Sequence, residues 1–304
     1  MKHLCPAFKL SPSGTARVGF TLIELMTVVA IVAVLAAILL PALAGARERS
    51  RGIYCLNNTR QLTLVWQLYA DEHEGALPYN MRMSGSPSPI SASTVPASTN
   101  NWVNNVMTWD LSSDNTNLAT ITQASLGSYA ADVTGIYHCP SDRVLSAVQR
   151  AAGWTQRIRS YSMNAMVGDP GPSLVNGRNV NNPGYRQFLK LDQIPHPTEV
   201  FVFLDEHPDS IDDGYFINTD SSGGYSQNSV TINEWMDLPA SYHNGGAAIS
   251  FADGHATMHQ WVNASTLAPV VPYEANLPFQ VPATASTSEG SDFEWLLDHM
   301  SIAN

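Results

Sequence analysis

Residues 19–43 have the sequence GFTLIELMTVVAIVAVLAAILLPAL. From Leu25 to Ala46 the chain carries no charged side chain, and this run is as long as the roughly 20 residues that a helix needs to cross a bilayer. The remainder is polar, with many Asn, Ser, Thr and Gly residues. The sequence therefore predicts one membrane-spanning helix near the N-terminus, followed by a water-soluble domain.

The segment ahead of Phe20 differs from an ordinary secretory signal. It contains Lys2, Lys9 and Arg17 and no acidic residue. A secretory signal has its cleavage site behind the apolar stretch, whereas here the basic leader ends at Gly19, in front of that stretch. This order indicates a leader that is removed ahead of the membrane helix.

The junction resembles the leader junction of type IV pilins and type II secretion pseudopilins. The residues that carry the resemblance are Gly19, Phe20, Thr21, Leu22, Glu24 and Pro41. It implies that a prepilin peptidase cuts between Gly19 and Phe20 and N-methylates Phe20. It also implies that Glu24 pairs with the amine of Phe20, its own or a neighbour's, during filament assembly.

Glu24 has a local explanation too. In the first turn of a helix an anion gains roughly 0.3–1 kcal/mol from the helix dipole, so an interfacial carboxylate is the alternative interpretation. Pro41 removes one helical hydrogen bond, and we expect a kink or local unwinding there.

Charge does not orient the protein in the membrane, since basic residues occur both in the leader and after the apolar run, at Arg47, Arg49, Arg51 and Arg60. The resemblance implies a single-pass protein of the bacterial inner membrane, with its ectodomain in the periplasm or on the cell surface.

The helix is expected to continue beyond the membrane. Leu62, Val65, Trp66 and Tyr69 fall on one helical face, and Gly75 then supplies a stop signal. We expect an α+β, pilin-like fold in which one long helix packs on a mainly antiparallel sheet. The predicted divisions are a leader (1–19), a transmembrane half-helix (20–46), an amphipathic half-helix (47–75), a β-rich ectodomain (76–268) and a tail (269–304).

Three strand regions and a last helix are predicted. Residues 200–204 form a continuous apolar run typical of a buried central strand, and residues 230–235 alternate. Residues 247–262 are expected to form a hairpin around a two-residue Asp253-Gly254 turn, which places Phe251, Ala256, Ile249 and Met258 on one core face. Residues 291–294 are typical of a capping box that opens a helix, and residues 84–99 are typical of an exposed loop.

A second resemblance lies in the ectodomain. His243, nine residues and then Asp253-Gly254 match the H-X9-DG element that accompanies pilin-like leaders in large bacterial families. The segments 55–62 (CLNNTRQL), 137–142 (YHCPSD) and 159–164 (RSYSMN) resemble other blocks of that group. They imply a pilin-like subunit and no specific activity.

The cysteines allow two interpretations. Removal of the leader takes Cys5 with it and leaves Cys55 and Cys139. Outside the cytoplasm these two residues could form a disulfide that closes a long loop, and the alternative is a pair of buried free thiols.

Metal ligation is a minority prediction, built from Asp205 or Glu206 with Asp253 or His255. A strand over 247–252 places His243 and Asp253 at its opposite ends, so this pair is not expected to chelate one ion. Turn geometry explains Asp253-Gly254, and a structural hydrogen bond explains His243. We therefore expect no cofactor, with a divalent cation as the alternative.

The predicted function is structural. The net charge of −11 argues against a nucleic-acid partner, and no nucleophile motif or phosphate loop suggests an enzyme. The expected partners are a prepilin peptidase, other pilin-like subunits and the inner membrane, in a pseudopilus or pilus of a type II secretion or type IV pilus-like system. The alternatives are an anchored binding module that does not polymerise and a metal-dependent hydrolase.

Overall fold

The computed structural model describes residues 20–82, 100–218, 235–273 and 291–304, and the chain divides into two compact units, 1–47 and 48–304. The predicted leader, the loop over 84–99, residues 230–234 of the strand predicted over 230–235, and most of the tail before residue 291 lie outside the described residues. Helix α1 (Leu22–Glu72) is a single helix of 51 residues, which confirms the expected long N-terminal helix. It continues through Pro41 as an α-helix, so local unwinding is not seen there and the kink stays a prediction.

The part of α1 in the first unit is apolar and uncovered within the chain. Its large side chains are exposed, for example Ile31 at 61% and Leu39 at 64%. Among the described residues, α1 is the helix whose length and hydropathy suit a membrane span. Apolar surface on this scale needs lipid or other protein to cover it.

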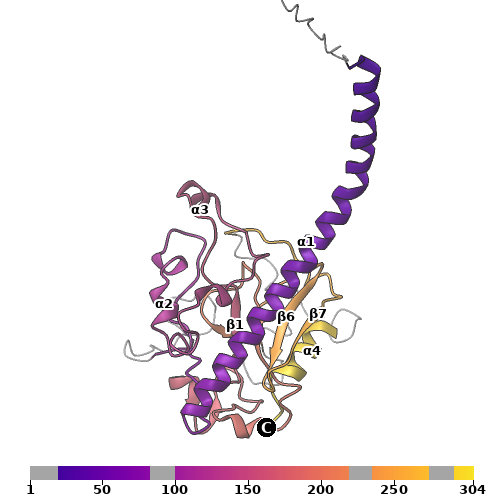
Figure 1. Ribbon diagram of the computed structural model, residues 1–304. Coiled ribbons are helices and arrows are strands. Elements are labelled where there is room, and N and C mark those ends of the chain that lie inside the picture. The colour runs from indigo at the N-terminus through magenta and orange to yellow at the C-terminus, as the bar shows by residue number, and fades with distance from the viewer. Residues whose placement is uncertain (1–19, 83–99, 219–234, 274–290) are drawn as a thin grey trace, which may run out of the picture. The chain divides into compact units, whose positions relative to one another are not determined.

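The second unit contains the rest of α1 and the remaining elements, of which α2, α3, α4, β1, β6 and β7 are labelled in Figure 1. The other helices are α2 (Ala119–Thr122), α3 (Ala147–Ala151) and α4 (Ser291–Met300), with 3₁₀ turns η1 (Ser113–Asn115), η2 (Thr134–Tyr137), η3 (Gly171–Ser173) and η4 (Leu191–Gln193). The strands are β1 (Tyr161–Asn164), β2 (Leu174–Val175), β3 (Arg178–Asn179), β4 (Phe201–Asp205), β5 (Tyr215–Phe216), β6 (Gly246–Phe251) and β7 (Ala256–Gln260).

The main sheet has the strand order β5-β1-β4-β6-β7, and β2 and β3 form a separate pair. All neighbours in the main sheet are antiparallel except β1 and β5. Strand β4 is central and buried along its whole length, as the apolar run over 200–204 predicts. The architecture is therefore α+β with a mostly antiparallel sheet.

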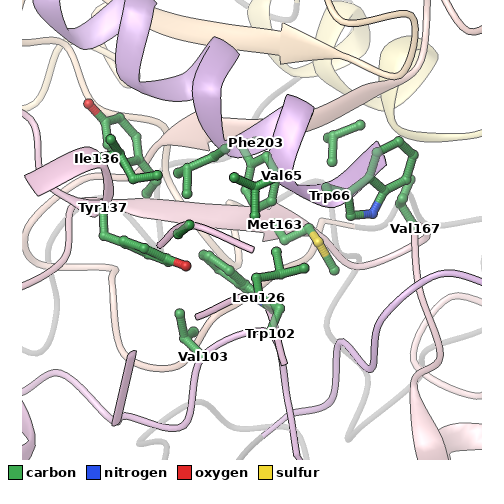
Figure 2. Close-up of a cluster of buried hydrophobic side chains, with 14 of the residues drawn as sticks. Val65, Trp66, Trp102, Val103, Leu126, Ile136, Tyr137, Met163, Val167 and Phe203 are labelled. Atoms are coloured by element: carbon green, nitrogen blue, oxygen red, sulfur yellow. The ribbon is translucent and has the colours of Figure 1, made fainter. Parts of the chain in front are cut away.

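One face of the sheet packs against α1. Leu62 and Trp66 of the helix are fully buried and belong to the same core as Phe203 of β4 and Met163 of β1 (Figure 2). The helical periodicity of 3.6 residues predicted that Leu62 and Trp66 face the core. Tyr69, on the same helical face, is partly buried and packs against this core. The amphipathic half of the helix thus covers the sheet, as expected.

The opposite face packs against α4. This helix begins at Ser291, where the sequence predicts it, and Phe293, Leu296 and Met300 are buried in a second core. Phe201 of β4 and Ile249 of β6 belong to this core as well. The sheet therefore has an apolar core on each side.

The predicted register of the β6–β7 hairpin is wrong by one residue. Ser250 pairs with Ala256 and Ile249 with Thr257, and the Phe251 amide donates to the His255 carbonyl. The loop thus has three residues and ends at Gly254 with φ of +93°, a left-handed position typical of such loops. Because side chains alternate between faces, the shift separates Phe251 and Ile249 from Ala256 and Met258.

Candidate functional site

The N-terminus of α1 is closed by a reciprocal hydrogen-bond pair. The amide and hydroxyl of Thr21 donate to Glu24 Oε2 at 2.8 and 2.6 Å, and the Glu24 amide donates to the Thr21 hydroxyl at 3.3 Å. This is a capping box, which satisfies amides that have no partner inside the helix. Phe20 is 79% exposed just ahead of it, and Gly19 lies outside the described residues. Glu24 therefore has a local role within its own chain.

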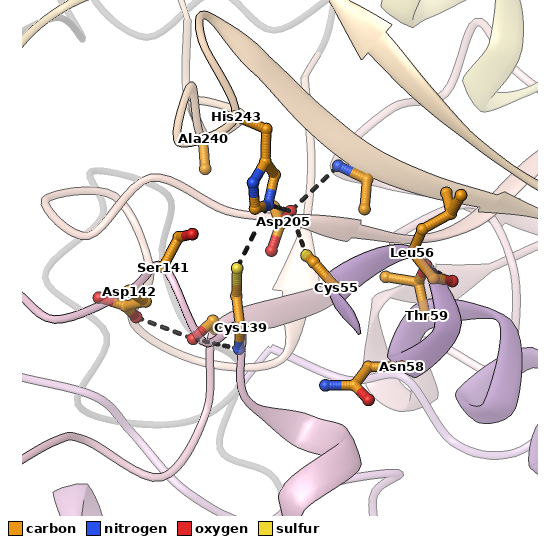
Figure 3. Close-up of polar contacts among 12 residues, drawn as sticks. Cys55, Leu56, Asn58, Thr59, Cys139, Ser141, Asp142, Asp205, Ala240 and His243 are labelled. Atoms are coloured by element: carbon orange, nitrogen blue, oxygen red, sulfur yellow. Dashed lines mark hydrogen bonds and ion pairs between the residues drawn. The ribbon is translucent and has the colours of Figure 1, made fainter. Parts of the chain in front are cut away.

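A second site lies in the ectodomain, where four segments that are distant in the sequence meet (Figure 3). Cys55 comes from α1, and Cys139 lies just after η2. Asp205 is the last residue of β4, and His243 lies in the turn that leads into β6. We refer to Cys55, Cys139, Asp205 and His243 as the four-residue cluster.

The atoms of the four-residue cluster converge. Each residue presents one ligand-type atom, and these atoms lie within 4.8 Å of one another. Cys55 Sγ donates to Asp205 Oδ2 at 2.8 Å, and Cys139 Sγ lies 3.4 Å from His243 Nε2. His243 Nε2 lies 3.6 Å from Asp205 Oδ2. The same imidazole nitrogen thus faces both a sulfur and a carboxylate.

The cluster is buried. Cys55, Cys139 and Asp205 have no exposed surface, and His243 is 6% exposed. Burial, together with Cys139 and Asp205, raises the pKa of the Cys55 thiol well above its usual value. Burial lowers the pKa of His243, but the hydrogen bonds and charges of Asp205 and Cys139 outweigh it and raise that pKa to about 10.

Two donors from outside the cluster form hydrogen bonds to Cys55 and Asp205. The Tyr161 hydroxyl of β1 donates to Cys55 Sγ at 3.2 Å, and the Ala248 amide of β6 donates to Asp205 Oδ2 at 3.0 Å. The second oxygen of Asp205, Oδ1, is buried without a hydrogen-bond partner among the described residues. The carboxylate therefore has unused capacity as a ligand.

The structure does not assemble the cation site predicted from Asp205, Glu206, Asp253 and His255. Asp205 belongs to the four-residue cluster, whereas the next side chain, Glu206, accepts a hydrogen bond from Ser210 at 2.5 Å. Burial raises the pKa of Glu206 to about 8, and the nearby Asp212 adds to this effect. The adjacent residues point to different surroundings because strand side chains alternate.

Asp253 and His255 form a separate pair at the hairpin tip. Their side chains meet at 2.6 Å, and the His255 ring stacks on Phe251 with 4.4 Å between centroids. Strand β6 separates this pair from His243, as the length of the strand predicts. The His243 backbone does close a turn onto Gly246, but its side chain joins the cluster, which the expected structural hydrogen bond in the turn did not include.

The two cysteines lie together and are buried free thiols in the structure, which is the alternative to the disulfide that the sequence left open. The sulfurs have different partners, Asp205 for Cys55 and His243 for Cys139. A signal for this arrangement was present in the sequence. The blocks 55–62 and 137–142 and the H-X9-DG element contain Cys55, Cys139 and His243, and the block 159–164 contains Tyr161.

A surface cavity of about 590 Å³ lies beside these segments. Two of its lining residues, Tyr54 and His138, are chain neighbours of the cluster cysteines. The cavity is lined by Tyr54, Asn58, Gly135, His138, Pro140, Asp142, Arg143, Thr155 and Gln156. The cavity therefore borders the segments that carry Cys55 and Cys139, and none of the four cluster residues lines it.

No family model and no solved structure matches the chain. The type IV wide pilus major component PilA4 of Thermus thermophilus is 34% identical over 89 residues, which represent 28% of this chain and 68% of that protein. The matched length exceeds the 51 residues of α1, so an apolar helix alone does not account for the likeness. Together with the long N-terminal helix on a mostly antiparallel sheet, this similarity means that the chain belongs to the type IV pilin family.

Proposed function

We propose that the protein is a structural subunit of a pilus or pseudopilus in a type IV pilus-like or type II secretion system. A prepilin peptidase removes residues 1–19 and methylates Phe20. Residues 20–46 then hold the protein in the bacterial inner membrane, with the ectodomain outside the cytoplasm. Filament assembly transfers this apolar segment from lipid to a bundle of neighbouring subunits.

The observation that supports this proposal best is the change of surroundings along α1. Side chains such as Ile31 and Leu39 are exposed, whereas Leu62 and Trp66 are fully buried. A helix that served only the core of the ectodomain would not expose a long apolar surface beyond that core. An apolar first half suits both the lipid before assembly and the helices of other subunits after it.

We propose that Glu24 favours the assembled filament over the free subunit in the membrane. The hydrogen bonds from Thr21 use one oxygen of the Glu24 carboxylate, and the capping box itself supplies no cation to pair with the negative charge. A carboxylate near the lipid edge is costly without a partner of opposite charge. The amine of Phe20, created by cleavage, supplies that charge in the same chain or in a neighbouring one.

The N-terminus of the mature protein tests the proposal. Mass spectrometry of the chain isolated from its native membrane should find methylated Phe20 as the first residue. Gly19→Leu should leave the precursor uncut, whereas Ser13→Leu, a change of similar size inside the leader, should be processed normally. A mature chain that begins at Met1, or beyond Ala30, would refute the proposal.

The chemistry of the ectodomain supports a structural role over hydrolysis. The four-residue cluster is buried, and a metal-dependent hydrolase needs a coordination position that substrate can reach. An anchored module that never polymerises remains the competing hypothesis, and the Glu24 variants described in the Discussion separate the two.

A further inference from the structure

We propose that the four-residue cluster binds one Zn²⁺ ion, which joins α1 to the sheet of the ectodomain. Two sulfurs, one imidazole nitrogen and one carboxylate oxygen make up a four-ligand set of the kinds that zinc takes in proteins. A closed set of four protein ligands is typical of structural rather than catalytic zinc. The inference is independent of whether the protein polymerises.

The spacing of the ligand atoms suits a tetrahedral ion. Bonds of about 2.0–2.3 Å to a tetrahedral centre set neighbouring ligand atoms roughly 3.3–3.8 Å apart. The Cys139 Sγ–His243 Nε2 distance of 3.4 Å and the His243 Nε2–Asp205 Oδ2 distance of 3.6 Å fall in this range. The 2.8 Å contact between Cys55 and Asp205 is a thiol hydrogen bond, and it lengthens once the ion replaces the proton.

Charge gives a second reason for a cation. Asp205 is fully buried, one of its oxygens has no hydrogen-bond partner among the described residues, and two thiols lie beside it. Donors from Tyr161 and Ala248 stabilise the anionic forms of Cys55 and Asp205, as outer partners of metal ligands do. On binding, the two thiols and the protonated imidazole of His243 release their protons, and the ion is held by the two thiolates, the carboxylate and Nε2 of the neutral imidazole.

A catalytic Cys-His-Asp triad does not fit the same contacts. In a triad the acid holds one imidazole nitrogen while the nucleophile uses the other. Here Cys139 and Asp205 both face Nε2, and Nδ1 makes no hydrogen bond among the described residues. Groups that face one and the same nitrogen are arranged as ligands around a metal ion are. A proton relay would need the acid and the nucleophile on different nitrogens of the imidazole.

A disulfide between Cys55 and Cys139 is the main competitor, because the two sulfurs lie within 4.8 Å. A disulfide would not explain why the Asp205 carboxylate and the His243 imidazole lie beside the two sulfurs. Zinc and a disulfide exclude each other chemically, since the metal needs both thiolates. One sample can therefore distinguish them.

The test uses the full-length protein in mild detergent. Metal analysis should find one zinc per chain, or uptake of one equivalent after the metal-free protein is titrated with Zn²⁺. Substitution with Co²⁺ should produce the sulfur-to-metal absorption bands of thiolate ligation. Alkylation of the two thiols should be slower with zinc bound than after removal of the metal by a strong chelator.

Variants locate the site. Cys139→Ser and His243→Gln should weaken Zn²⁺ binding by more than the 10–100-fold (about 1.4–2.7 kcal/mol) that loss of an outer partner typically costs. His255→Gln, which changes a histidine of the hairpin pair outside the cluster, should bind zinc as the wild type does. If a ligand variant does not fold, the Co²⁺ spectrum and the alkylation rates of the wild type still decide the question. Intact thiols that take up no zinc, or a Cys55–Cys139 disulfide in native material, would overturn the inference.

Discussion

The hydroxyls of Thr63 on α1 and Ser250 on β6 share a hydrogen bond of 2.7 Å, and both side chains are fully buried. Each hydroxyl also lies near a backbone carbonyl, that of Thr59 at 3.1 Å and that of Phe203 at 3.3 Å, respectively. The pair is a polar contact within an apolar interface. It fixes the position of the helix along the strand more narrowly than apolar packing would.

Thr63→Val should lower the free energy of unfolding by about 1–3 kcal/mol, because it leaves the buried Ser250 hydroxyl short of a partner. The double variant Thr63→Val/Ser250→Ala should cost less than the sum of the two single changes. Urea denaturation of the full chain in detergent measures all three. Thr116→Val, at an exposed threonine, should stay within about 0.5 kcal/mol of the wild type. Additive costs in the double variant would contradict the coupling.

Glu24→Ala should leave cleavage intact but impair assembly, because the proposed partner of the Phe20 amine is lost. Glu24→Gln keeps hydrogen-bonding capacity without the charge and should be impaired as well. Thr21→Ala weakens the capping box and keeps the carboxylate, so it should assemble. Crosslinking between ectodomains in cells is the measurement.

These variants distinguish charge pairing by Glu24 from helix capping by Glu24. If Glu24→Ala and Glu24→Gln crosslink like the wild type, pairing through this carboxylate is wrong, and the anchored binding module becomes the better hypothesis. If Thr21→Ala fails equally, helix capping and not charge pairing explains the need for Glu24.

The hairpin tip depends on Gly254. Its φ of +93° is strained for any residue with a Cβ, although only Gln67 atoms at 3.4 Å or more would face that Cβ. Gly254→Ala should therefore cost about 1–2 kcal/mol through the backbone alone. Gly135→Ala, at a glycine with open space and no positive φ, should be neutral or stabilising. Equal melting temperatures for the two variants would refute the turn geometry.

Two leucines on α1 provide a matched test of its packing half. Leu62 is fully buried, whereas Leu64 is 46% exposed. Leu62→Ala should cost about 2–5 kcal/mol by leaving a cavity, and Leu64→Ala should stay within about 0.5 kcal/mol in the isolated subunit. Thermal denaturation measures the two variants. Similar losses of stability would mean that α1 packs on the sheet through a different face.

Local sequence patterns predicted the long N-terminal helix, the last helix and the central strand, and gave no prediction for α2 and α3. The 3.6-residue spacing of Leu62, Val65 and Trp66 and the apolar run over 200–204 each report burial directly. The hairpin register was missed for a physical reason. All of β6 is buried, so it has no polar face to fix the register, and Asp253-Gly254 suggests a shorter loop than the one that forms.

The four-residue cluster was harder to predict because its members come from a helix, a loop, a strand end and a turn. Strand geometry correctly separated His243 from Asp253, but it contains no information on which distant segments approach His243. Only the fold brings Cys55, Cys139 and Asp205 to that ring. The short motif blocks marked three of the four residues without indicating their chemistry.

Helix α1 contributes its first half to the proposed anchor and its second half to the ectodomain core. Because α1 runs through both halves, tension applied to the anchor acts on residues such as Leu62 and Trp66. Extracting the helix would require exposing that core and breaking the Thr63–Ser250 contact. The mechanical strength of the tether is thus set by the resistance of the whole domain to unfolding.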